Sequence, residues 1–226
     1  MEIKPIAYIK TNFKEKFGIP RQSGIVNEIK GEIVFEKQFR NPDALRGIEE
    51  YSHLWLIFDF SKNHRDHWSP TVRPPRLGGN TQVGVFATRS PFRPNNLGLS
   101  CVKLEGIKKD EKLGHTLIVS GVDLLDNTPI YDIKPYIPYC DSKPDAKGSF
   151  SDNFKEYKID VLYDENTFKN IDDNTKNQII KIIEQDPKPA YKQDKKEYKF
   201  LFSDYEICFE ISENTAKIIE INKMQL

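Results

Sequence analysis

The first 140 residues consist of short apolar runs separated by turn signals, and this pattern limits the fold more than any other feature. Each run has the length of a strand and is rich in valine, isoleucine, phenylalanine and tyrosine, which favour strands. The runs are Ile3–Ile9, Gly31–Phe35, His53–Phe60, Val83–Ala87, Leu99–Ile107, Thr116–Val122 and Ile130–Ile133. One short helix is expected in NPDALRGIEE, with Asn41 as cap and Pro42 at the first helical position. Many short strands with few helices predict a mainly β domain, either a barrel or a sandwich.

A second, smaller unit is expected after residues 135–152, which read as a linker. An amphipathic helix over Thr175–Gln185 carries isoleucines on one side. The strands expected around it are Phe154–Leu162, Tyr198–Phe202, Tyr205–Ile211 and Ala216–Ile221, with Glu213-Asn214 turning the last hairpin. The sequence therefore predicts a β-rich domain over residues 1–140 and a small α+β C-terminal domain over residues 153–226.

Composition restricts the function classes. No run approaches the roughly 18 apolar residues of a membrane helix, and the N-terminus lacks the pattern of a secretory signal. The three cysteines show neither a metal-binding pattern nor a disulfide framework, so we expect a cytoplasmic protein with reduced thiols. The formal net charge is zero, but residues 61–103 hold seven lysines and arginines against one aspartate. A local charge of +6 suits an anionic partner.

Arginine is used selectively in this chain. All eight arginines lie at or before position 93, although 26 of the 34 cationic residues are lysine. Arginine offers a planar fork and stacking that lysine cannot replace, so some of these positions are expected to need that geometry. Arg40 and Arg46 can equally be ordinary surface residues.

The segment Thr88–Ser100, TRSPFRPNNLGLS, is expected to bind a ligand. Arg89 and Arg93 flank a turn, Pro94 restricts the backbone, and Gly98 permits close approach. The alternative is a packed turn with surface arginines. Two further segments, Asp123–Tyr136 and Phe17–Gly24, could complete a pocket, although either could be an ordinary hairpin or loop.

Other chemistries are less well supported. The pair His64 and His67 has a spacing seen in metal sites but lacks a nearby third ligand, so no metal is expected. Ser90 and Ser100 could suggest a hydrolase, but the sequence has no GxSxG elbow. No glycine-rich turn opens a helix after a strand, so a Rossmann nucleotide site is not supported.

Five segments together resemble the TrmO family. They are YSHLWLIF, TVRPPRLGGN, FATRSPFRPNNLGLS, DNTPIYDIKPYIP and QDPKPAYK, and they occur in the order 51–58, 71–80, 86–100, 126–138 and 185–192. The resemblance implies a single-sheeted β-barrel methyltransferase that works as a homodimer and uses S-adenosylmethionine. It implies N6-methylation of threonylcarbamoyladenosine at position 37, in the anticodon loop of tRNA. The alternative is a β-barrel module that binds tRNA without catalysis.

The resemblance also implies roles for individual residues. The expected cofactor-binding residues are Pro20, Arg21, Gln22, Asn63, His64, Arg89, Leu99, Asp126, Asn127, Thr128 and Pro129. Two positions depart from the family pattern: Asn96 replaces a common proline, which we expect to loosen the loop, and Asn127 replaces a common glycine. Asparagine tolerates left-handed turns, so the second change should be mild.

The expected reaction needs few catalytic groups. The methyl donor is already electrophilic, so alignment and exclusion of water are the main tasks, helped by a base that takes the N6 proton. The expected catalytic residues are Asp132 and Asp126 as candidate bases and Arg93 as a candidate carboxylate-binding group. The expected RNA-binding residues are Arg65, Trp68, Arg73, Arg76 and Lys134.

Overall fold

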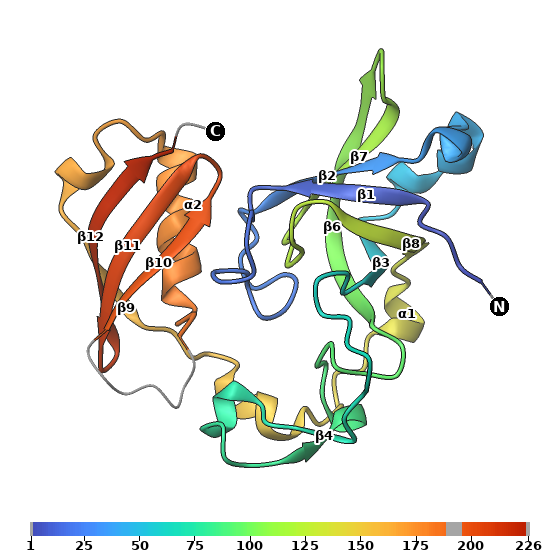
Figure 1. Ribbon diagram of the computed structural model, residues 1–226. Coiled ribbons are helices and arrows are strands. Elements are labelled where there is room, and N and C mark those ends of the chain that lie inside the picture. The colour runs from blue at the N-terminus through green and yellow to red at the C-terminus, as the bar shows by residue number, and fades with distance from the viewer. Residues whose placement is uncertain (1, 189–195, 225–226) are drawn as a thin grey trace.

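A closed six-stranded barrel forms the N-terminal part of the computed structural model, which describes residues 2–188 and 196–224 (Figure 1). The strand order around the barrel is β1-β2-β7-β6-β3-β8, and each neighbouring pair is antiparallel. The strands are β1 (Ala7–Thr11), β2 (Lys30–Phe35), β3 (His53–Asp59), β6 (Leu97–Asp110), β7 (Gly114–Ser120) and β8 (Thr128–Pro135). The structure thus confirms a mainly β fold and selects the barrel over the sandwich.

Alternating burial explains why these segments form a barrel. In β3, Leu54, Leu56 and Phe58 are buried, whereas the residues between them are only partly buried. Side chains of a strand point alternately to its two faces, so every second residue fills the interior. The pairing of β1 with β8 closes the sheet and satisfies its edges.

The region expected to form one helix instead holds two 3-10 helices, Pro42–Leu45 and Ile48–Glu50. The expected cap is present, since the Asn41 side chain accepts a hydrogen bond from the amide of Asp43. Gly47 then takes a left-handed conformation with φ of 83° and interrupts the helical path. The prediction of a single helix was therefore wrong, because the glycine sits in the middle of it.

Two other expected strands are shorter than predicted. Only Val83–Gly84 (β5) is a strand, paired with Thr71–Val72 (β4), and Val85–Ala87 is a 3-10 helix. Only Asp160–Leu162 (β9) is a strand in the region expected from residue 154. The β4–β5 ladder pairs two residues of each strand, and the ladder of β9 with β12 (Thr215–Lys223) pairs three. The ribbon of β4 and β5 lies away from the barrel (Figure 1).

The C-terminal part is a four-stranded sheet in the order β10-β11-β12-β9, packed against helix α2 (Figure 1). Its elements are α2 (Asp173–Glu184), β10 (Lys196–Phe202), β11 (Tyr205–Ser212) and β12 (Thr215–Lys223). Asp172 caps α2 through the amide of Thr175, at 3.0 Å. The expected helix and meander are confirmed, whereas residues 189–192 of the QDPKPAYK motif lie outside the described residues.

The remaining helices lie in connections. Helix α1 (Pro138–Asp141) follows the barrel, and the other 3-10 helices are Lys37–Phe39, Pro75–Leu77, Ser149–Phe154 and Glu165–Phe168. Within the described residues, no helix has the length and hydropathy needed to cross a membrane.

The C-terminal sheet packs against the barrel domain through the loop that follows β1. The rings of Phe13 and Phe202 meet edge to face at 5.4 Å, in one continuous core. On α2, Gln178 Nε2 donates a hydrogen bond of 2.7 Å to the carbonyl of Glu28. The loop that follows β1 therefore lies between the two parts of the molecule, and one wall of the site described below comes from that loop.

Candidate active site

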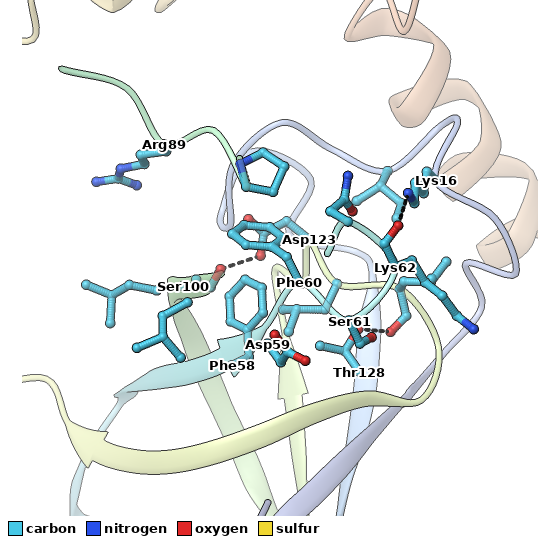
Figure 2. Close-up of a pocket in the computed structure, with 18 of the residues that line it drawn as sticks. Lys16, Phe58, Asp59, Phe60, Ser61, Lys62, Arg89, Ser100, Asp123 and Thr128 are labelled. Atoms are coloured by element: carbon cyan, nitrogen blue, oxygen red, sulfur yellow. Dashed lines mark hydrogen bonds between the residues drawn. The ribbon is translucent and has the colours of Figure 1, made fainter. Parts of the chain in front are cut away.

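A cavity of about 510 Å³ opens where β3 ends and β6 begins. Its walls come from the loop after β1, the segment after β3, the loop before β6 and the segment before β8, which meet only in the folded chain (Figure 2). The volume lies within the range of about 300–1,000 Å³ that is usual for small-molecule sites.

An aromatic floor closes the cavity from the barrel core. Phe58 in β3 is paired directly with Gly98 in β6, and a Cβ atom at Gly98 would lie 2.2 Å from Cζ of the Phe58 ring. The ring of Phe60 meets Phe58 edge to face at 5.0 Å (Figure 2). Gly98 is thus required because the ring of Phe58 occupies the space where a side chain would be. The sequence prediction that Gly98 allows close approach is confirmed, although the approaching group is Phe58.

Asp123 is the carboxylate best placed for chemistry in this cavity. Ser100 Oγ donates a hydrogen bond of 2.7 Å to Asp123 Oδ1 (Figure 2). Burial raises the pKa of Asp123 to about 6, while the hydrogen bond from Ser100 and the positive charge of Arg89 oppose the rise. A carboxylate with such a pKa is ionised at neutral pH and still basic enough to share a proton.

A second carboxylate, Asp59, also lines the cavity. Only 8% of Asp59 is exposed, and its Oδ1 lies 2.7 Å from Nε2 of His64. His64 therefore supports the cavity wall through Asp59. Among the described residues, no group of three or more histidine, cysteine, aspartate or glutamate side chains is placed to hold a metal ion.

The two arginines of the loop before β6 have different environments. Arg89 lines the cavity, and its guanidinium donates to Oε1 of Gln22. Arg93 also lines the cavity, but its NH1 donates to carbonyls of its own loop, to that of Thr88 at 2.8 Å and to that of Val85 at 3.2 Å. Arg89 is therefore available to a ligand, whereas Arg93 mainly holds the loop in shape.

Asn96 stabilises this loop rather than loosening it. Its Nδ2 donates a hydrogen bond of 2.7 Å to the carbonyl of Pro91, and its own carbonyl accepts one of 2.9 Å from the amide of Phe60. The first bond fastens the loop before β6 to itself, and the second ties that loop to the segment after β3. The expectation of a looser loop was wrong, because the amide side chain supplies a cross-link that proline cannot.

Comparison with known proteins identifies the family. Residues 8–142 match the tRNA-methyltransferase O N-terminal domain, and residues 153–224 match the TrmO C-terminal domain. The chain belongs to the TrmO family. It is 37% identical over 223 residues to the tRNA (adenine(37)-N6)-methyltransferase of Escherichia coli strain K12, which covers 94% of both chains. The protein of the same name from Eikenella corrodens is 44% identical over 170 residues, covering 74% of this chain and 95% of the relative.

Solved structures agree with this assignment. A crystal structure of TrmO from Pseudomonas aeruginosa superimposes with a TM-score of 0.79 at 30% identity, covering 99% of this chain and 97% of that one. The resemblance drawn from the five sequence segments is thereby confirmed at the level of the family and the fold.

In this TrmO family member, the structure brings most of the expected cofactor-binding residues to one cavity. Those that line it are Pro20, Arg21, Gln22, Asn63, Arg89, Leu99 and Thr128. His64 does not line the cavity, and its mostly exposed side chain contacts Asp59 instead. Residues of three separate loops therefore meet as the motifs indicate, although their contacts with a cofactor stay a prediction.

The Asp126–Pro129 turn reaches the cavity only through Thr128. Asp126 faces β1 instead, where it accepts from the amide of Thr11 at 3.0 Å and pairs with Lys14 at 3.1 Å. Asn127 has φ of 61°, which confirms that this position needs a left-handed residue. The turn anchors β8 to β1, and Pro129 is already part of their pairing.

Asp132 lies farther along β8 and does not line the cavity. Its carboxylate pairs with Lys134 at 2.9 Å, and both side chains are about half exposed. The structure therefore does not bring the two expected bases, Asp132 and Asp126, to the site. Of the three aspartates in this segment, only Asp123 lines the cavity, and nothing in the sequence indicates which of the three faces inward.

The expected RNA-binding residues divide into two groups. Trp68 is 49% exposed and stacks on Phe86 at 6.1 Å, while the guanidinium of Arg65 lies 3.5 Å from the centre of the Phe92 ring. Phe86, which sequence reasoning missed, is itself 70% exposed. Arg73 is exposed between β4 and the 3-10 helix that follows.

Arg76 belongs to the interior and not to this surface. Its side chain is 14% exposed, donates to the carbonyl of Gln185 at 2.9 Å and lies 3.8 Å from a carboxylate oxygen of Asp186. The expected contact of Arg76 with RNA is therefore not supported, because the C-terminal part covers its guanidinium. Lys134 is engaged by Asp132 on β8.

Proposed function

We propose that this chain is an S-adenosylmethionine-dependent methyltransferase that methylates N6 of adenine 37 in tRNA. The relatives named above carry this activity in their names. The observation that carries the proposal is the cavity at the start of β6, which holds a partly buried carboxylate at Asp123 beside an accessible cation at Arg89. A non-catalytic tRNA-binding module would not need such a desolvated carboxylate.

The residues of the cavity fit the proposed cofactor. Its lining offers apolar surface at Phe60, Leu97 and Leu99 for an adenine ring and Arg89 for the carboxylate of the methionine part. The aspartates supply negative charge that favours a sulfonium cation. When bound, S-adenosylmethionine supplies an electrophilic methyl group.

Asp123 is proposed as the group that accepts the N6 proton. The Ser100 hydroxyl donates to Oδ1 of this carboxylate, and the backbone of Ser23 and of Asp123 itself also hydrogen-bonds to it, which fixes its orientation in the cavity. Phe58 and Phe60 shield the floor, so water is excluded from the side where the proton moves. The role that the family motifs assigned to Asp126 or Asp132 is therefore transferred to Asp123.

The substrate adenine is proposed to carry a threonylcarbamoyl group, as the family resemblance implies. Lys16 and Lys62 line the cavity in addition to Arg89, so a second carboxylate besides that of the cofactor can be bound (Figure 2). We also propose a cytoplasmic homodimer. Sedimentation at equilibrium tests the dimer, and the expected mass is twice 26.3 kDa.

The decisive experiment for the proposed function is the Arg89→Ala variant. Loss of a charge-assisted hydrogen bond costs about 1.5–3 kcal/mol, so calorimetry should show S-adenosylmethionine bound about 10- to 100-fold more weakly than by the wild type. At subsaturating cofactor, methylation should fall together with this affinity, as measured by mass spectrometry of tRNA nucleosides.

The matched control for this variant is Arg46→Ala. Arg46 is an exposed arginine paired only with Asp43 in the described part of the chain, so its loss should leave binding unchanged. Absence of any binding heat in the wild type would favour the non-catalytic module instead.

The exposed aromatic surface beside the cavity is proposed to bind the anticodon loop. Trp68 and Phe86 present stacked rings, and Arg65 and Arg73 add positive charge. Aromatic rings interleaved with cations suit unstacked bases and phosphates. Since the loop that follows Phe86 supplies Thr88 and Arg89 to the cavity, a base stacked here would lie at its rim.

Replacing Phe86 by alanine should therefore weaken tRNA binding about tenfold, because one base loses its stacking partner. Filter binding measures this effect, and calorimetry should show unchanged affinity for the cofactor. The control is Phe39→Ala, which removes a ring that is 39% exposed on a 3-10 helix outside this surface. Unchanged tRNA affinity with a loss of dimer mass would assign the surface to contact between copies.

A further inference from the structure

Arg21 connects the cavity to the C-terminal part of the molecule. It lines the cavity, and its NH2 group donates hydrogen bonds of 3.1 Å to the carbonyls of both Asp186 and Lys188. Those carbonyls belong to the loop that follows α2, about 165 residues away in the sequence. Burial, with a further contribution from the nearby Arg76, lowers the pKa of Arg21 to about 10.

Asp186 is the carboxylate that balances these charges. Only 3% of Asp186 is exposed, and its Oδ2 accepts a hydrogen bond of 2.9 Å from Tyr157 and lies 3.8 Å from Arg76. Two guanidinium groups, Arg21 and Arg76, thus lie close to one buried carboxylate. Without it they would repel each other in a region shielded from water.

A chain of hydrogen bonds leads from this cluster to the cavity. The Gln22 side chain donates from Nε2 to the carbonyl of Arg21, and its Oε1 accepts from Arg89. Arg89 in turn lies close enough to lower the pKa of Asp123. A displacement of Arg21 would therefore move the carbonyl that holds Gln22, and with it the partner of Arg89.

We infer that Asp186, in the C-terminal part, is a positioning residue for the cofactor cavity and acts through Arg21 and Gln22 on Arg89. This inference rests on the proposed function, because it assigns Arg89 to cofactor binding. It gives the C-terminal part a role in the methyltransferase site although none of its residues lines the cavity in the described structure.

The test is the Asp186→Asn variant of the full chain. Asparagine has the same shape and tolerates the left-handed backbone of position 186, where φ is 48°, so the substitution removes mainly the charge. We expect the dissociation constant for S-adenosylmethionine, measured by calorimetry, to rise about tenfold. The KM for the cofactor should rise in parallel while kcat at saturation changes less than about twofold.

The matched control is Gln178→Leu. Gln178 is also 3% exposed and also joins the two parts of the molecule, through the carbonyl of Glu28, but within the described residues neither it nor Glu28 lines the cavity. Both variants are compared at a temperature well below their thermal unfolding. If the dissociation constant for S-adenosylmethionine rises equally in both variants, the effect is merely structural and the inference is overturned. The inference is also overturned if this constant does not rise in Asp186→Asn.

A double-mutant cycle with Gln22→Ala tests the route. If Asp186 acts through Gln22, then Asp186→Asn should have little further effect in the Gln22→Ala background. Full additivity would exclude this route and overturn the inference. A wild type that gives no binding heat would instead contradict the proposed function, so the two failures are distinguishable.

Discussion

The Asp123→Asn variant is expected to lose methylation by at least about 100-fold while becoming more stable at neutral pH. Activity falls because asparagine cannot accept the N6 proton from its position beside Ser100. Single-turnover kinetics with modified tRNA measure the loss, and it should appear in kcat.

The Ser100→Ala variant removes the hydrogen bond that lowers the pKa of Asp123. The acidic limb of the profile of methylation rate against pH should therefore move to higher pH.

The gain in stability follows from the same pKa. Burial raises the pKa of Asp123 from 3.8 to about 6, so the folded chain binds the proton more tightly than the unfolded chain. The buried ionised carboxylate therefore lowers the free energy of unfolding. This destabilisation is absent below about pH 4, grows as the pH rises towards 6, and reaches its full size above about pH 6. Denaturant unfolding should show Asp123→Asn more stable by about 1–3 kcal/mol at pH 7.5 and no more stable at pH 4.

The control for this prediction is Asp126→Asn, in the same segment. Asp126 pairs with Lys14 and accepts the amide of Thr11, so its loss should reduce stability and leave the rate of methyl transfer nearly unchanged. The opposite result, an inactive Asp126→Asn with an active Asp123→Asn, would return the role of base to the residue that the family motif indicated.

The Gly98→Ala variant is expected to close the cavity from its aromatic floor. The new methyl group would lie 2.2 Å from the Phe58 ring, so the ring must move, and the cavity is the open space beside it. Overpacking of this kind costs about 1–3 kcal/mol of stability. Calorimetry should detect no binding of S-adenosylmethionine under conditions where the wild type is saturated.

Gly84→Ala provides the control for Gly98→Ala. Position 84 has no atom within 4 Å of an added Cβ, and its backbone is not left-handed, so alanine should be tolerated. Normal cofactor binding by Gly98→Ala would show that Phe58 can turn elsewhere and that the floor of the cavity is not rigid.

Much of this fold could be predicted from local sequence. The barrel strands follow from alternating apolar residues with branched and aromatic side chains, which satisfy the two faces of a strand without help from distant residues. The single expected helix over residues 41–50 failed because one glycine interrupts it at φ of 83°, a conformational detail that composition does not reveal.

The candidate site was only partly predictable. Arg89 and the Pro20–Gln22 segment could be chosen because their motifs are local and distinctive. The choice among Asp123, Asp126 and Asp132 could not be made in this way. A difference of a few residues decides whether a carboxylate faces the cavity, the edge of β1 or solvent, and the burial that raises the pKa of Asp123 comes from the cavity and barrel residues around it.

The loop TRSPFRPNNLGLS shows both sides of this division. The sequence by itself determined the family and the strand pattern, and it predicted that this loop serves a ligand, because these depend on residue types and short spacings. Only the tertiary structure decided that Arg89 faces the cavity, that Arg93 binds its own loop, and that Arg76 and Arg21 meet Asp186. Charge, burial and hydrogen-bond partners depend on which distant segments come together, and that is a property of the folded chain alone.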